Sequence, residues 1–138
     1  MYLIDTNVIG EARKRAKANP GVIAFFKNVA ASREPVFLSA ISVGELRCGV
    51  ELIRHRGEAE QALRLETWLA SVVESFGERI LAFDSDAAQI WGYLRVPDPG
   101  HALDKQIAAI ALVNDLTLVT RDVADFEGSG VKLANPFQ

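Results

Sequence analysis

The stretch that decides the fold is Tyr2-Leu3-Ile4-Asp5-Thr6-Asn7-Val8-Ile9, close to the start of the chain. Its first three residues are apolar and typical of a short buried β-strand. The three polar residues that follow are of types that favour the N-terminus of a helix. An acid therefore stands where a strand gives way to a helix. In open α/β sheets, this edge of the sheet is where ligands bind.

Short β-rich runs alternate with longer helical patterns along the rest of the chain, which predicts an α/β fold with a parallel sheet covered by helices. The predicted strands are Tyr2–Ile4, Val36–Leu38, Arg79–Phe83, Thr117–Thr120 and a short Val131–Leu133. A short basic helix should follow the first strand to about Lys17. The other predicted helices are Val22–Val29, a helix capped by Ser39 or Ser42 and reaching Ile53, Leu63–Phe76, Asp84–Leu94 and Leu103–Asn114.

The composition is that of an ordinary globular domain, with 138 residues, 49% hydrophobic and 24% charged. We find no linker, repeat or low-complexity tract, and expect residues 1–138 to form a single domain. Cys48 is the only cysteine, which excludes an internal disulfide; its neighbours Leu46 and Val50 predict a small core residue. No apolar run is long enough to span a membrane and no secretory signal is present, so we expect a cytoplasmic protein.

The net charge of −3 is unfavourable for general electrostatic attraction to nucleic acids. Any role in nucleic-acid binding must therefore depend on local features. One such feature is the basic run Arg13–Lys17, which either contacts phosphates or forms the solvated face of the first helix.

Four acids are placed so that they can converge at one end of the sheet. Asp5 ends the first strand and Asp122 follows the fourth, and these strands are neighbours in the commonest doubly wound order. Glu45 lies in the first turns of the helix after the second strand. Asp104 lies in the first turn of the helix that leads into the fourth strand.

Such a cluster requires protons or cations. Two carboxylates about 4 Å apart repel each other by roughly 4 kcal/mol at an effective dielectric constant of 20. With no nearby set of cysteines or histidines, oxygen ligands favour Mg²⁺ or Mn²⁺ over Zn²⁺. A divalent ion held in this way polarises a phosphoryl oxygen and lowers the pKa of an attacking water. The pattern thus indicates metal-dependent cleavage of nucleic acid.

Four segments, in order and spread over nearly the whole chain, together resemble the PIN-domain ribonuclease toxins of the VapC and FitB type. They are Leu3–Val8 (LIDTNV), Leu38–Leu46 (LSAISVGEL), Asp104–Ala109 (DKQIAA) and Thr120–Asp122 (TRD). The resemblance implies a three-layer PIN fold with a central parallel sheet in strand order 3-2-1-4-5. It also implies an endoribonuclease with Mg²⁺ or Mn²⁺ at Asp5, Glu45, Asp104 and Asp122.

The resemblance further implies partners and supporting residues. The partners are an RNA substrate, a second copy of the chain in a homodimer, and a cognate antitoxin of the VapB or FitA type. The antitoxin would block the acidic pocket with its C-terminal segment and bind operator DNA with its N-terminal domain. Thr6 and Thr120 match hydroxyl positions beside the metal ligands, and Asn7 is expected to support them.

The fourth acid is open between two residues. Many relatives carry Asn at the position of Asp122 and have their acid in a following Asp-Phe pair, which here is Asp125-Phe126. We favour Asp122 as the ligand and place Asp125 beside it.

Each acid also has a purely structural interpretation. Asp5 could cap the first helix and Asp122 a turn, and Ser42–Glu45 fits a capping box. Asp104 suits the dipole at a helix N-terminus. Asp84 and Asp86 suit a helix start, since the third strand should lie at the far edge of the sheet. We interpret His101 as an exposed loop residue, with contact to a substrate as the less favoured alternative. Arg47 should point away from Glu45, because it lies two residues further along a helix.

Two rival functions remain. The first is a phospho-accepting receiver domain, with Asp84 as phosphoacceptor and Thr120 and Lys132 as its partners. The second is a PIN-like subunit with little catalytic activity that mainly tightens the binding of an antitoxin to DNA.

Overall fold

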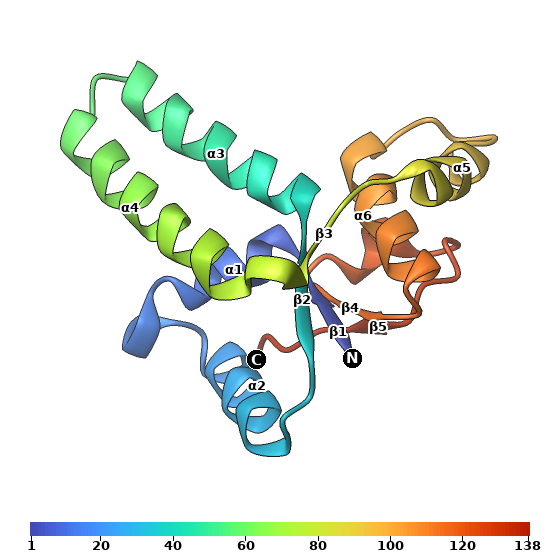
Figure 1. Ribbon diagram of the computed structural model, residues 1–138, viewed down its shortest axis with the longest axis horizontal. Coiled ribbons are helices and arrows are strands. Elements are labelled where there is room, and N and C mark those ends of the chain that lie inside the picture. Colours follow the sequence, from blue (N-terminus) through green and yellow to red (C-terminus); the bar gives the residue numbers. More distant parts are fainter.

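Five parallel strands form the centre of the molecule, in the order β3-β2-β1-β4-β5 (Figure 1). The computed structural model describes residues 1–138. The strands are Tyr2–Ile4 (β1), Val36–Ser39 (β2), Ile80–Leu81 (β3), Thr117–Val119 (β4) and Leu133–Ala134 (β5). The α/β class predicted from the pattern and the strand order implied by the resemblance are both confirmed.

Six helices surround the sheet, and α3 and α4 run side by side as a long hairpin that extends away from it (Figure 1). The helices are Thr6–Ala12 (α1), Pro20–Ser32 (α2), Ala40–His55 (α3), Ala59–Phe76 (α4), Ser85–Leu94 (α5) and Ala102–Val113 (α6). None of them combines the length and apolar character that crossing a bilayer would require.

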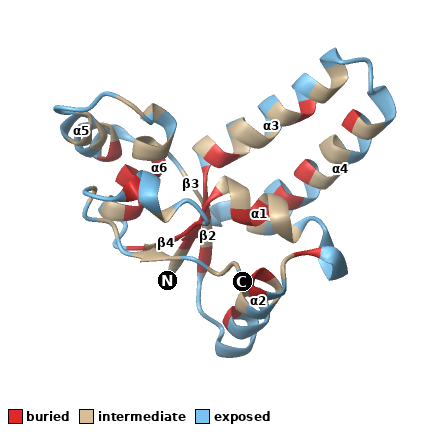
Figure 2. Cartoon of the chain, turned by 180° about the vertical axis from the view of Figure 1, so that it is seen from behind, coloured by how far each residue is buried: buried red, intermediate tan, exposed pale blue.

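Alternate residues of the central strand face opposite layers of the molecule, as the two-residue period of a strand dictates. Leu3 packs in a core cluster with the buried residues of α6, whereas Ile4 packs in a second cluster with residues of α1, α2 and α4. Both side chains are fully buried. Figure 2 shows the buried residues along the strands and on the inner faces of the helices. Helices thus cover both faces of the sheet, giving three layers.

The first helix is shorter than predicted. It ends at Ala12 instead of reaching Lys17, and Arg15–Lys17 form a separate 3₁₀ turn in which Arg15 adopts a left-handed φ of 54°. The carboxylate of Glu11 accepts hydrogen bonds from the backbone N–H of Asn19 and from Lys14. These contacts hold the chain in a turn, although its sequence is compatible with continued helix.

Two strand predictions also need correction. The third strand is only Ile80–Leu81, because Gly77–Arg79 form a 3₁₀ turn and the Arg79 guanidinium donates to the carbonyl oxygens of Ser75 and Val36. The fifth strand lies slightly later than predicted, at Leu133–Ala134.

The start of α3 is capped by Ser39, whose hydroxyl accepts a hydrogen bond from the backbone N–H of Ser42 at 3.0 Å. The alternative capping box beginning at Ser42 does not form, since Ser42 already lies in the first turn and is buried. This cap fixes where α3 leaves β2, and thereby the position of Glu45 in the second turn.

Cys48 is exposed, so its prediction as a core residue is wrong. Val50 is buried and Leu46 half-buried in a small cluster between α3 and α4. A residue two positions away on a helix is rotated by about 200°. Cys48 therefore lies on the face of α3 opposite its contact with α4.

Candidate metal centre

Asp5 lies at the edge of the sheet where β1 and β4 end, and it is only 5% exposed. Its side chain caps α1, with Oδ1 accepting the backbone N–H of Thr6 at 2.8 Å. The other oxygen, Oδ2, accepts the hydroxyl of Thr120 at 2.7 Å. The two strand ends are thus joined through one buried carboxylate.

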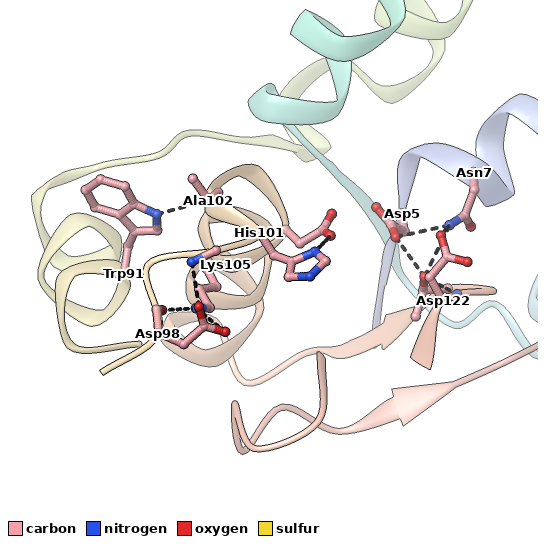
Figure 3. A network of polar contacts seen from close by, with 11 residues as sticks. Asp5, Asn7, Trp91, Asp98, His101, Ala102, Lys105 and Asp122 are labelled. Carbon is pink, nitrogen blue, oxygen red and sulfur yellow. Dashed lines mark hydrogen bonds and ion pairs between the residues drawn. The ribbon is translucent and has the colours of Figure 1, made fainter. Parts of the chain in front are cut away.

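Asn7 connects this carboxylate to the segment after β4 (Figure 3). Its amide nitrogen lies 3.0 Å from Oδ2 of Asp122, 3.3 Å from Oγ1 of Thr120 and 3.4 Å from Oδ2 of Asp5. Its amide oxygen accepts the backbone N–H of Arg121 at 3.2 Å. Asn7 therefore holds Asp122 on the same side of the sheet as Asp5.

Glu45 is positioned from α3 by Thr6 of α1. The Thr6 hydroxyl lies 2.7 Å from Oε1 of Glu45 and 2.8 Å from Oγ of Ser42. A hydroxyl has one proton, and an ionised carboxylate is the stronger acceptor. Thr6 therefore donates to Glu45 and accepts from Ser42, which fixes the carboxylate relative to Asp5.

A second group of ligand-type side chains comes from the start of α6 and the 3₁₀ turn Val123–Phe126. One ligand atom from each of His101, Asp104 and Asp125 lies within 4.8 Å of the others. The Nδ1 atom of His101 is 3.5 Å from Oδ2 of Asp104. Asp104 is half-buried, whereas His101 and Asp125 are exposed.

Electrostatics connect the two groups. Burial raises the pKa of Asp5 to about 6, the charges of Asp104 and Glu45 add to this, and hydrogen bonds from Thr120 and Thr6 oppose it. Burial, followed by the charges of Asp125 and Glu45, also raises the pKa of Asp104. Neither Lys nor Arg forms an ion pair with any of these four acids. Of the neighbouring candidate ligands only Asp122 has such a partner, because Arg121 Nε lies 4.0 Å from its Oδ1. The site is thus a concentration of negative charge with little compensation.

The donor set fits a hard divalent cation, since it consists of carboxylate oxygens with a single imidazole at its edge. Asp5, Glu45 and Asp104 are near enough for the charges of Glu45 and Asp104 to act on Asp5. Ligand atoms within 4.8 Å of one another are found only for His101, Asp104 and Asp125, so joint metal binding by Asp5, Glu45 and Asp104 stays a prediction. Asp122 borders the group beside Asp5, and Asp125 borders it beside Asp104. Which of these two is the fourth ligand stays a prediction.

Several other sequence interpretations can be judged directly. Asp84 caps α5 by accepting the backbone N–H of Ala87 at 2.9 Å, which confirms its role as a helix-start residue. Asp86 lies exposed in the first turn of α5. Arg47 pairs with Glu66 at 2.5 Å and Glu51 at 3.4 Å, and thus points away from Glu45 as predicted. The Arg13–Lys17 run is exposed, but it follows the end of α1 and so does not form the solvated face of that helix.

The receiver-domain alternative does not agree with the topology. It needs Asp84 beside Thr120, but β3 lies at one edge of the sheet and is separated from β4 by two strands. The alternative therefore lacks the neighbouring strands that its phosphoacceptor requires.

Two residues gained roles that the sequence reasoning missed. The sequence predicts for Ser42 only a role as a helix cap, but its buried hydroxyl contacts Thr6 beside Glu45. For His101 the sequence predicts an exposed loop residue or a substrate contact, but its ring lies beside Asp104. The spacing of three residues between His101 and Asp104 was the one available signal, because residues so spaced lie on one helix face.

Comparisons with known proteins agree on one family. The family model described as PIN domain matches residues 2–127. The chain is 39% identical to toxin FitB of Neisseria gonorrhoeae, over 99% of both chains. It is 32% identical to VapC ribonuclease Y4jK of Sinorhizobium fredii, over 100% of this chain and 99% of that protein. The crystal structure of FitAcB from N. gonorrhoeae matches with a TM-score of 0.84 and 37% identity, over 99% of this chain and 98% of that chain.

Proposed function

The chain belongs to the PIN-domain family, and from this premise we propose that it is a divalent-metal-dependent endoribonuclease, the toxin of a toxin–antitoxin pair. The observation that carries the proposal is the gathering of carboxylates near the ends of β1 and β4, of which Asp5, Glu45 and Asp104 have no Lys or Arg partner. Only Asp122 has such a partner, Arg121, at 4.0 Å. A cluster of this kind binds cations or takes up protons. The relatives named as a toxin and as a ribonuclease support the same function.

The residues that would hold the metal are Asp5, Glu45 and Asp104, completed by Asp122 or Asp125. When bound, Mg²⁺ or Mn²⁺ supplies polarisation of a phosphoryl oxygen and a lowered pKa for a nearby water. The carboxylates themselves repel a phosphodiester, so RNA approaches only after their charge is neutralised. Metal would therefore be required for substrate binding as well as for hydrolysis.

The protein's own contribution is to fix the ligand oxygens in place. Thr120, the Thr6 N–H and Asn7 orient Asp5, and the Thr6 hydroxyl orients Glu45. These supports matter because hydrogen bonds that orient metal ligands are typically worth 10–100-fold in affinity or activity.

The test is cleavage of total RNA by protein purified free of any antitoxin, with Mn²⁺, with Mg²⁺ and with EDTA. Wild type should cleave only with metal, and Asp5→Asn and Asp104→Asn should lower the rate by more than about 100-fold. Asp86→Asn is the matched control, because it removes an exposed acid in α5 that lies outside the site. Equal cleavage by wild type and both site variants would indicate a contaminating nuclease and contradict the proposal.

We also propose two partners, a second copy of the chain and a cognate antitoxin that covers the acidic site and binds operator DNA. Expression of the chain alone should arrest growth, and co-expression of the antitoxin should relieve the arrest. Asp104→Asn should not arrest growth but should still bind the antitoxin. A wild-type protein that binds antitoxin and tightens its DNA binding, yet neither cleaves RNA nor arrests growth, would favour the rival of a non-catalytic subunit.

A further inference from the structure

His101 immediately precedes α6, and Figure 3 shows its ring at the start of that helix. The ring lies beside the carboxylate of Asp104. Its backbone is in the left-handed region, with φ 54°, and its carbonyl oxygen accepts the backbone N–H of Lys105 at 2.9 Å. These features fix the place of the residue at the helix start. The Nδ1 atom lies 3.5 Å from Oδ2 of Asp104.

The neighbouring charged groups leave this imidazole available. Lys105 is turned away from Asp104, because its ammonium group donates to the carbonyl oxygen of Asp98 and lies 4.0 Å from the Asp98 carboxylate. The carboxylate of Asp125 has no hydrogen bond or ion pair. His101 and Asp125 therefore face Asp104 without competing partners.

The three ligand atoms are close enough to share one ion after a small adjustment. They lie within 4.8 Å of one another, and two atoms bound to the same ion at about 2.1 Å are at most about 4.2 Å apart. Because His101 and Asp125 are exposed, rotation of their side chains can close this difference. Asp104 also belongs to the main cluster, since its charge acts on Asp5. The imidazole thus lies at the edge of the same centre.

We propose that His101 supplies a nitrogen ligand to this metal centre and makes it prefer Mn²⁺ to Mg²⁺. The inference rests on the proposed function, in which the acids bind a divalent metal. Mg²⁺ takes oxygen ligands almost exclusively and keeps its waters, whereas imidazole nitrogen is a ligand of transition metals. Replacing one water or carboxylate oxygen by imidazole therefore favours the transition metal. The spacing His101-Ala102-Leu103-Asp104 presents both ligand types from the start of one helix.

The direct test is pulsed electron paramagnetic resonance of Mn²⁺ bound to the purified protein, which detects the ¹⁴N nucleus of a coordinated imidazole. The chain contains only two histidines, and His55 lies exposed at the far end of α3, so it provides a matched control. Wild type and His55→Gln should show the nitrogen coupling. His101→Gln should lose it while remaining folded by circular dichroism.

Titration calorimetry then measures the preference itself. His101→Gln should weaken Mn²⁺ binding by at least about tenfold and change Mg²⁺ binding by less than about twofold. Equal weakening of both ions, or no change in Mn²⁺ binding, would overturn the inference.

The two proposals fail in different ways. Mn²⁺ that binds wild type without nitrogen coupling, and is lost in Asp104→Asn, overturns the role of His101 and leaves the acidic centre standing. Absence of any Mn²⁺ or Mg²⁺ binding to wild type at millimolar concentration overturns the metal-dependent function, and this inference with it.

Discussion

Asp5 shows how a single residue can be unfavourable for stability and necessary for function. Three donors surround its carboxylate, from Thr6, Asn7 and Thr120, and each favours the ionised form. Burial and the nearby acids outweigh them, so the pKa rises to about 6. Without metal, the folded protein at neutral pH therefore carries a buried negative charge on Asp5, and this charge lowers its stability.

We expect Asp5→Asn to stabilise the metal-free protein at pH 8. The pKa of Asp5 is higher in the folded protein than in the unfolded chain, so the folded state binds more protons between about pH 4 and 6. Stability from this group is present below pH 4 and is lost as pH rises through 6, by at most about 3 kcal/mol. Urea unfolding in EDTA at pH 8 should show a gain of about 1–3 kcal/mol for the variant.

The same comparison at pH 4.5 should show most of that difference gone, because wild-type Asp5 is then protonated in the folded state. Asp86→Asn serves as the control for the general effect of removing a charge. A wild type as stable as Asp5→Asn at pH 8 would mean that the carboxylate is not under electrostatic strain.

Thr6 gives a second prediction at this scale. Thr6→Val keeps the shape of the side chain but removes the hydroxyl that donates to Glu45 at 2.7 Å. RNA cleavage and Mn²⁺ affinity should each fall by about 10–100-fold. Thr6→Ser, which restores the donor, should recover most of both; a Val variant with unchanged Mn²⁺ affinity would show that Glu45 needs no such support.

At the scale of elements, the start of a helix could be predicted where the capping residue lies next to it in the sequence. The end of a helix could not be predicted where it depends on a contact with a residue further along the chain. Asp84 caps α5 by accepting a hydrogen bond from Ala87 in the first turn, and the residue types at this position predict such a cap. The end of α1 depends on Glu11 contacting Asn19, eight residues away, which periodicity does not reveal. Likewise, the exposure of Cys48 follows from which faces the α3–α4 hairpin leaves uncovered.

The Ser39 cap of α3 should contribute more to the free energy of unfolding than an exposed serine at a helix start that forms no cap. Ser39→Ala removes a buried hydroxyl that caps the helix and contacts Ser42 at 3.2 Å. We expect a loss of about 1–2 kcal/mol in the free energy of unfolding, measured in urea. Ser85→Ala, at an exposed first position of α5, should change it by less than about 0.5 kcal/mol. Equal effects of the two substitutions would contradict the assigned cap.

At the scale of the whole molecule, the order β3-β2-β1-β4-β5 explains why distant acids meet. Asp5, Glu45 and Asp104 follow strands or begin helices at one edge of the sheet, so their convergence could be predicted. The arrangement of His101 and Asp125 around Asp104 could not be predicted in full, and only the three-residue spacing of His101 and Asp104 indicates part of it. The arrangement depends on a left-handed residue before α6 and on the 3₁₀ turn after β4, which hydrophobic patterns do not determine.

Metal should stabilise the fold as a whole, because it binds acids that the unfolded chain does not hold together. At an ion concentration 100-fold above Kd, Mn²⁺ should add about 2.7 kcal/mol and raise Tm by at least about 5 °C. Differential scanning calorimetry of Asp104→Asn should show less than half of this shift, and Asp86→Asn should show all of it. An equal shift in both variants would indicate binding elsewhere on the surface.

The most direct measurement is an anomalous difference map from crystals soaked in Mn²⁺, collected at the manganese absorption edge. We predict a peak within about 2.5 Å of carboxylate oxygens of both Asp5 and Asp104. A well-ordered site without a peak at saturating Mn²⁺, or manganese only at unrelated surface acids such as Asp86, would contradict the account.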